Sequence, residues 1–230
     1  MQAKGVTLAA RFAHIEHSRI DALSDGIFSI ALTLLGFDLI SVVGKTAASK
    51  DLTLALTQQW PVFFSYLLGF FVLYSIWYQY HVMGQFAGRP HALMVWQHGF
   101  GLMFATLIPF ATSLLGQNLN TPNMPTAVFY FGVTIFADAP VQVLFFLAQL
   151  RNGDNPVTDD APFSGRTYTR LGLLLMSIMS VFGLISVLIA LWQPWVAIGL
   201  YSIYLASRVN PVTTFNRMLP RFERLVNQAT

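Results

Sequence analysis

Four residues of one apolar stretch have the spacing of a single helix face. Ile30, Leu34 and Phe37 follow one another at i, i+4 and i+7, and Thr33 lies beside them. Repeated around a symmetry axis, this face would form stacked apolar rings with a ring of hydroxyl groups between them. Apolar rings can gate a pore by dewetting. Packing between membrane helices also uses apolar stripes, so the spacing alone leaves both interpretations open.

A polar cluster precedes these residues and could brace the helix that carries them. Charges inside a membrane are costly and are normally paired, so we expect Arg19 to pair with Asp21 or Asp25. Histidines from later segments would complete a hydrogen-bonded network, although a satisfied interfacial histidine is an equal alternative for each. The members of this predicted brace are Arg19, Ser24, Asp25, His81 and His98.

Two aspartates have separate interpretations. Asp38 closes the apolar stretch, where a ring of carboxylates would concentrate cations at an outer pore mouth; a solvated helix end is the alternative. Asp138 interrupts a later apolar segment, and a proton relay through it would indicate a transporter. A polar partner on a neighbouring helix, or a protonated carboxyl group in an apolar site, would make it structural. No second carboxylate lies at a corresponding depth, which favours the structural role.

The composition is that of a helical membrane protein. It is 55% hydrophobic and 10% charged, whereas soluble domains have about 25% charged residues. The absence of cysteine excludes disulfides and thiolate metal sites. The sequence lacks a nucleophile elbow, a zinc-type histidine pair, a phosphate loop and a T-V-G-Y-G filter. We therefore expect no enzyme, no cofactor, no nucleic-acid partner, and no metal beyond a permeating ion.

Apolar runs predict six membrane spans. The first four are 19–40, 60–83, 92–115 and 126–150, with Pro109 inside the third and Asp138 and Pro140 interrupting the fourth. No charge appears between Arg170 and Arg208, and the Gln193-Pro194 pair divides this run into a fifth and a sixth span. In this arrangement 11 of the 13 Lys and Arg residues lie on one side, and only Lys45 and Lys50 lie on the other. Both termini are then expected to be cytosolic.

The polar cluster and the helix after it carry a resemblance. The residues from Arg19 to Asp25 read RIDALSD and resemble the R-x-x-x-F-S-D signature of the transmembrane protein 175 family, which comprises endolysosomal and bacterial potassium channels. Leu23 departs from the phenylalanine of that signature, and His98 stands where the family has asparagine. Further similarity extends through the first three spans, at Trp77, at His81 and around the Pro109-Phe110 pair.

The resemblance implies roles for the stripe. Ile30 and Leu34 match the apolar positions that narrow the family's pore, and Thr33 matches the threonine tied to potassium preference. Phe37 falls where the family often has leucine, and a larger ring there would narrow the outer pore. The family pattern also implies four copies of the pore helix around an axis, which a six-span chain supplies as a homotetramer.

We therefore expect an all-α, six-span membrane protein whose first helix lines the central pore of a homotetramer. Residues 1–18 would form a cytosolic segment, 19–208 the channel domain, and 209–230 a basic cytosolic tail. The expected function is a potassium-preferring cation channel embedded in the lipid bilayer of a bacterial cell membrane. The alternative is a proton-coupled transporter that uses Asp138, and a non-conducting membrane scaffold is a weaker rival.

Overall fold

The computed structural model describes residues 17–84, 92–153, 157–158, 161 and 164–208, and every secondary-structure element in these ranges is an α-helix. Of the predicted N-terminal segment 1–18, the structure describes only His17 and Ser18. The predicted basic tail, 209–230, lies outside the described residues. The all-α expectation is confirmed for the described part of the chain. Its helices are α2 (His17–Thr46), α3 (Leu52–Gln58), α4 (Trp60–Gly84), α5 (Ala92–Asn118), α6 (Met124–Phe136), α7 (Asp138–Asn152), α8 (Gly165–Ile189) and α9 (Pro194–Arg208).

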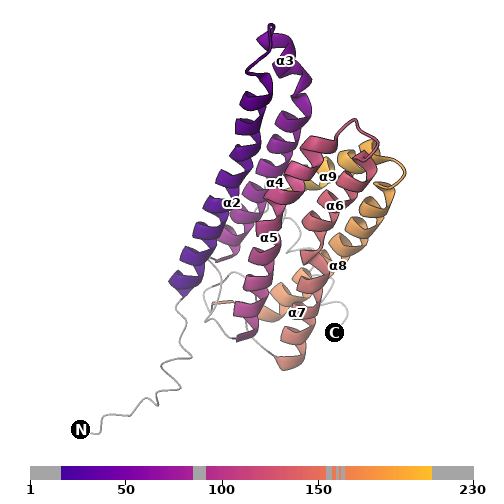
Figure 1. Cartoon of the computed structure of the whole chain (residues 1–230). Helices are drawn as coiled ribbons and strands as arrows, with labels where there is room; N and C mark the ends of the chain where they lie inside the picture. The colour runs from indigo at the N-terminus through magenta and orange to yellow at the C-terminus, as the bar shows by residue number, and fades with distance from the viewer. Residues whose placement is uncertain (1–16, 85–91, 154–156, 159–160, 162–163, 209–230) are drawn as a thin grey trace, which may run out of the picture.

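The helices pack in two adjoining groups. α2, α4 and α5 contact one another along one flank of the bundle, while α6, α7 and α8 form the other flank (Figure 1). α5 belongs to both groups because it also contacts α6 and α7. The short helix α9 contacts α4, α6 and α8. The helix that carries the predicted pore stripe, α2, therefore lies at the edge of the bundle.

Within the described residues, five segments are long and apolar enough to cross a membrane: Ser18–Thr46, Trp60–Val82, Ala92–Asn118, Met124–Asn152 and Gly165–Ile189. The fourth contains the predicted interruption, since α6 ends at Phe136 and α7 begins at Asp138. Pro140 lies in the first turn of α7, where its missing N–H costs no helical hydrogen bond. The expected sixth span corresponds to α9, whose 15 described residues reach about 22 Å, against a bilayer core of about 30 Å.

The first helix is longer than the sequence indicated. α2 continues to Thr46, so Asp38 lies inside the helix and does not end it. The last turns of α2 are partly buried, since Val42 is 1% exposed. Within the helix, the Thr46 hydroxyl donates to the Val42 carbonyl oxygen at 2.9 Å. The loop that follows holds the short helix α3, which the Asp51 side chain caps by accepting from the Leu54 N–H at 3.0 Å.

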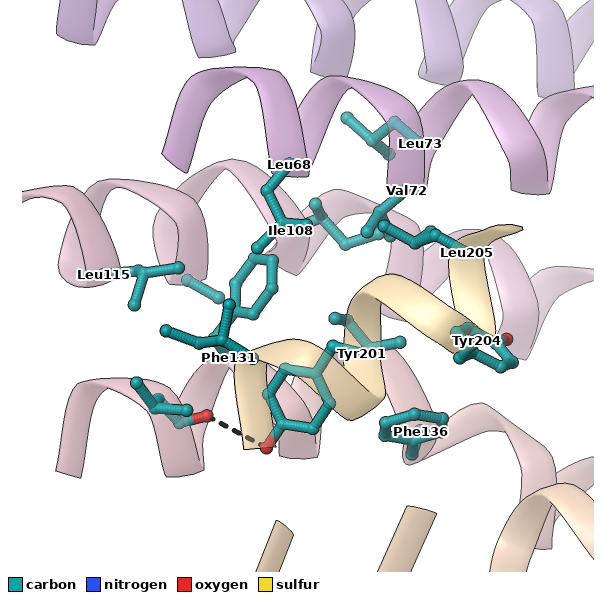
Figure 2. Packing of buried hydrophobic residues seen from close by; sticks show 14 of the residues in the cluster. Leu68, Val72, Leu73, Ile108, Leu115, Phe131, Phe136, Tyr201, Tyr204 and Leu205 are labelled. Atoms are coloured by element: carbon teal, nitrogen blue, oxygen red, sulfur yellow. Dashed lines mark hydrogen bonds between the residues drawn. The ribbon is translucent and has the colours of Figure 1, made fainter. Parts of the chain in front are cut away.

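The core lies where α9 meets α4, α5 and α6. Tyr201 of α9 is fully buried and its hydroxyl donates to the Val128 carbonyl oxygen at 3.3 Å, and Figure 2 shows it beside Phe131 of α6. Ile108 and Leu115 of α5 and Leu73 of α4 complete the same cluster. The short last helix is therefore an integral part of the packed bundle.

Contacts between side chains place several helix ends together. Trp77 and Gln79, near the end of α4, bond to Asp25 near the start of α2 and to Arg208 at the end of α9. We call this side of the bundle the basic end. The described arginines that lie there, near the corresponding ends of α2, α7, α8 and α9, are Arg19, Arg151, Arg166, Arg170 and Arg208. Lys45, at the other end of α2, and Lys50 just beyond it lie on the opposite side, while Lys4, Arg11, Arg89, Arg217, Arg221 and Arg224 fall outside the described residues.

The contact between α6 and α8 leaves no room for a side chain at Gly183. A Cβ added there would lie 2.6 Å from both Cβ and Cγ of Phe136, atoms near the backbone that cannot easily move away. We expect Gly183→Ala to lower the free energy of unfolding by about 1–3 kcal/mol. The unfolding midpoint in detergent would measure this. Gly199→Ala is the control because nothing lies within 4 Å of its added Cβ, and an equal loss there would contradict the prediction.

Candidate functional site

One face of α2 is buried against other helices of the same chain. Phe28, Ala31 and Leu35 are 1%, 2% and 1% exposed, and they follow one another at helical spacing. This face packs against α4 and α5, and the Phe28 ring meets the Tyr80 ring edge-on with centroids 5.7 Å apart. The rotation of α2 about its own axis is therefore fixed by packing within the protomer.

The opposite face of α2 carries the predicted stripe and is not covered by any described helix. Ile30, Leu34 and Phe37 are 63%, 44% and 58% exposed, and Thr33 is exposed between them. The hydroxyl of Thr33 donates to the Ser29 carbonyl oxygen at 2.8 Å. Because its one hydrogen is used in that bond, the hydroxyl oxygen keeps acceptor capacity for a cation or a water molecule. This face can meet lipid, a partner, or the same face of further copies.

Two residues of the predicted brace, Ser24 and Asp25, contact other helices. The Ser24 hydroxyl lies 2.5 Å from Nε2 of His98 and also donates to the Ile20 carbonyl oxygen at 2.8 Å. A hydroxyl has one hydrogen, so if Ser24 donates it to Ile20, His98 Nε2 is the donor of the second contact. The Trp77 indole donates to Asp25 Oδ1 at 2.8 Å. Two hydrogen bonds thus tie the start of α2 to α4 and α5.

The two histidines of the predicted brace have different positions. His98 lies within the bundle, and its ring meets the Tyr80 ring with centroids 4.5 Å apart. His81 is exposed and stacks on Trp77 with centroids 5.6 Å apart. His98 therefore contacts α2 directly, whereas His81 stacks on the indole that donates to Asp25.

Arg19 stands apart from its expected partners. Among the described residues it forms no ion pair with Asp21 or Asp25, and its side chain is exposed. Arg19 and Ile30 are about three helical turns apart, so the arginine continues the exposed face of α2. The structure pairs Asp25 with the Trp77 indole in place of the arginine.

Asp38 is tied to α5 and is partly buried. The Ser113 hydroxyl donates to Asp38 Oδ1 at 2.8 Å, and Gln117 Nε2 donates to the Ser113 oxygen at 2.9 Å. The carboxylate therefore links α2 and α5 on the side of the bundle away from the basic end. Its predicted role at an outer mouth stays a prediction.

Asp138 lies at a cavity of about 240 Å³ inside the protomer, near the basic end. Gln142, one turn along α7, donates to Asp138 Oδ1 at 3.0 Å, and Gln97 of α5 donates to Gln142 at 2.6 Å. Gln149 in turn donates to Gln97 at 2.7 Å. The carboxylate thus ends a chain of amides that joins α5 to α7.

Comparison with known proteins relates this chain to a family of potassium channels. Residues 19–109, which contain α2, α4 and most of α5, match the family model described as the endosomal/lysosomal potassium channel TMEM175. A potassium channel of Chamaesiphon minutus is 32% identical over 127 residues, which cover 55% of this chain and 62% of that relative's length. A potassium channel of Streptomyces collinus is 27% identical over 208 residues, which cover 89% of this chain and 98% of the relative. The chain is therefore similar to TMEM175 potassium channels, and it spans 62% of the length of the relative from Chamaesiphon minutus.

A solved structure also shares the fold of this chain. The crystal structure of a lysosomal potassium-selective channel TMEM175 homolog from Chamaesiphon minutus matches with a TM-score of 0.66 at 23% identity. The match covers 84% of this chain and 98% of the solved one. The resemblance inferred from the RIDALSD segment is therefore confirmed, and so is its membrane-embedded helical fold.

Sequence reasoning missed the polar residues inside the membrane spans of this chain. Gln97, Gln142 and Gln149 each lie in an apolar segment and form the amide chain that ends on Asp138. Three uncharged amides in membrane spans were the available signal, because a buried amide needs partners. Trp77 was noted for resemblance only, and its bond to Asp25 depends on how α2 and α4 are rotated toward one another.

The indole bond to Asp25 can be tested with a conservative change. Trp77→Phe keeps an aromatic ring but removes the N–H, which leaves the Asp25 carboxylate without this donor. We expect a loss of about 1–3 kcal/mol in the free energy of unfolding. The unfolding midpoint in detergent would measure it. Trp96→Phe is the matched control, since Trp96 is 66% exposed, and an equal effect there would argue against the brace.

Proposed function

We propose that the protein is a potassium-preferring cation channel whose pore is lined by α2 from several copies of the chain. The observation that carries this proposal is the uncovered stripe of Ile30, Thr33, Leu34 and Phe37 on α2. The opposite face of α2 is already packed against its own protomer, which leaves the stripe free to face an axis. Similarity to TMEM175 supports this assignment, because the similar proteins of Chamaesiphon minutus and Streptomyces collinus are potassium channels.

A homotetramer is the proposed assembly. One chain has a single α2, so a closed ring around a pore requires further copies related by rotation. The family pattern of the sequence calls for four. Arg19 continues the stripe at its basic end, and in a ring it would face the axis or a neighbouring copy, since it has no ion-pair partner among the described residues of its own protomer.

The proposed chain crosses the membrane six times, with α9 as the sixth crossing. The start of α2 and the end of α9 both lie at the basic end, as an even number of crossings requires. α9 is short for a bilayer core, but neighbouring helices bury it, and local thinning or tilt accommodates short spans. The arginines of the basic end favour a cytosolic location for that side. Both termini would then be cytosolic in a bacterial cell membrane.

Selection would depend on two kinds of ring. Ile30 and Leu34 would form narrow apolar rings that hold water poorly, so an ion must lose part of its hydration shell to pass. Thr33 would place hydroxyl oxygens between these rings, where they replace some of the lost water. The larger Phe37 ring would narrow the pore toward the side where Asp38 lies. Potassium loses its hydration shell at lower cost than sodium, so a partly dehydrating passage would favour potassium.

The hydroxyl of Thr33 can be removed without changing the side-chain shape. Thr33→Val keeps the branched volume and deletes the oxygen, so we expect potassium over sodium preference to fall about threefold or more, with a smaller change in total flux. Reversal potentials under mixed-ion conditions would measure the preference. Thr106→Val on α5 is the control, because that hydroxyl is also exposed and also bonds to its own helix. Unchanged preference in Thr33→Val would remove this residue from the selectivity mechanism.

Potassium flux from liposomes that hold the purified protein tests the function itself. Flux that persists with no proton gradient indicates a channel. Flux that requires a proton gradient would point to the transporter that uses Asp138, and no flux under any gradient would point to a scaffold.

A further inference from the structure

The cavity at the basic end is entered by an arginine from the last described helix. Arg208, at the end of α9, lines this cavity of about 240 Å³ together with residues of α2, α4, α5 and α7. The guanidinium carbon of Arg208 lies 4.7 Å from the centroid of the Tyr204 ring. An N–H of the same group donates to Gln79 Oε1 on α4. The protein thus places one of its own guanidinium groups against an aromatic face and an amide oxygen.

The cavity also holds a carboxyl group. Asp138 lines it together with Arg208, and Gln142 donates to Asp138 Oδ1 at 3.0 Å. The Tyr204 ring face and the Gln79 oxygen, with a carboxyl group lining the same cavity, suit a planar cation with several N–H donors. A compact ammonium group lacks the planar face that stacks on an aromatic ring while its N–H groups donate in the plane.

The guanidinium is connected to the start of α2 through a short stretch of α4. Gln79 accepts from Arg208, and Trp77, two residues earlier, donates to Asp25 of α2. Tyr204 is 8% exposed and lies in the buried cluster of Figure 2, so the arginine extends from a rigid part of the bundle. A shift of this arginine would therefore move the segment of α4 that holds α2.

We propose that this cavity is a guanidinium-binding site, filled in the protein by its own Arg208, and that through it α9 positions α4 and the pore helix α2. The site lies inside each protomer, away from the exposed stripe of α2. Arg208 is a positioning residue in this scheme, and its effect on conduction rests on the proposed channel function. The binding of a guanidinium group to the cavity does not depend on the channel function.

Chemical rescue tests the proposal. Arg208→Ala empties the site and should lower potassium flux per assembled oligomer about tenfold, the loss expected for one charge-assisted contact. Methylguanidinium at low millimolar concentration should then enter the vacated site and restore flux to within about threefold of the parent. Arg208→Lys keeps the charge but lacks the planar donors, so it should remain impaired.

Two controls separate this effect from others. Arg170→Ala removes an exposed arginine near the same end, and methylguanidinium should leave its flux unchanged or reduce it by entering the pore. Tetramethylammonium, a cation without N–H donors, should not rescue Arg208→Ala. Parent-like flux from assembled Arg208→Ala would overturn the proposal. Reduced flux that methylguanidinium does not restore would also overturn it.

The unfolding midpoint tests guanidinium binding without a flux measurement. Methylguanidinium should raise the unfolding midpoint of purified Arg208→Ala and leave that of the parent unchanged. If the variant fails to assemble, adding methylguanidinium throughout purification should recover the oligomer, and no recovery would overturn the site. If the parent itself passes no potassium, the channel function fails, while the midpoint shift still decides whether the cavity binds guanidinium.

Discussion

Replacing Ile30 with asparagine is expected to raise potassium flux about tenfold and to lower the preference for potassium over sodium. Ile30 is 63% exposed on the uncovered face of α2, so the amide would project where the proposed ring narrows the pore. Amide groups can substitute for water that the ion loses there, and lowering the barrier by about 1.4 kcal/mol is enough for about a tenfold gain in rate. Reconstituted potassium and sodium flux, measured beside an oligomer assay, gives the result.

Ile203→Asn is the matched control for this change. Ile203 of α9 is 64% exposed, so it has the same residue type and nearly the same exposure as Ile30 in one protomer. A face that meets lipid gains nothing from an amide and loses stability, because the polar group has no partner there. We expect the control to lower the oligomer yield without raising flux. Ion preference and flux that stay unchanged in assembled Ile30→Asn would remove α2 from the pore.

The apolar stripe shows how far the sequence could lead and where it stopped. Spacing alone placed Ile30, Leu34 and Phe37 on one face, but α2 is apolar on several sides, as membrane helices generally are. Packing distinguishes these sides, because Phe28 and Leu35 are buried while the stripe is exposed. Hydropathy cannot choose between two apolar faces, since lipid and protein interior are equally apolar.

Partners between helices were the least predictable part of the site. Opposite charges close in sequence suggested a pair of Arg19 with Asp21 or Asp25, yet Trp77 is the group that bonds to Asp25. Such a choice depends on how two helices are rotated about their axes, and packing over their whole length sets that rotation. Helix ends were limited in a similar way. Asp38 looked like an end because it is charged, but a bond from Ser113 stabilises it inside α2.

Two phenylalanines of α2 should respond in opposite ways to the same substitution. Phe28 is 1% exposed and packs on Tyr80, so Phe28→Ala opens a cavity and should lower the free energy of unfolding by about 3–5 kcal/mol. Phe37 is 58% exposed on the stripe, so Phe37→Ala should leave the unfolding midpoint nearly unchanged and increase flux by widening the proposed outer ring. The unfolding midpoint measures the stability of both variants, and potassium flux from liposomes measures conduction. Size-exclusion chromatography shows whether each variant assembles.

Each phenylalanine is the control for the other, because the residue type, the helix and the substitution are the same. The contrast separates the pore from the alternative that the stripe packs against another subunit. A packing stripe would lose contacts between subunits in Phe37→Ala, since membrane helices associate mainly through van der Waals contact, and the oligomer would dissociate. In a pore, the Phe37 side chains face water and not a packed neighbour, so removing the phenyl rings costs few packing contacts. Dissociation of the Phe37→Ala oligomer would therefore identify the stripe as a subunit interface.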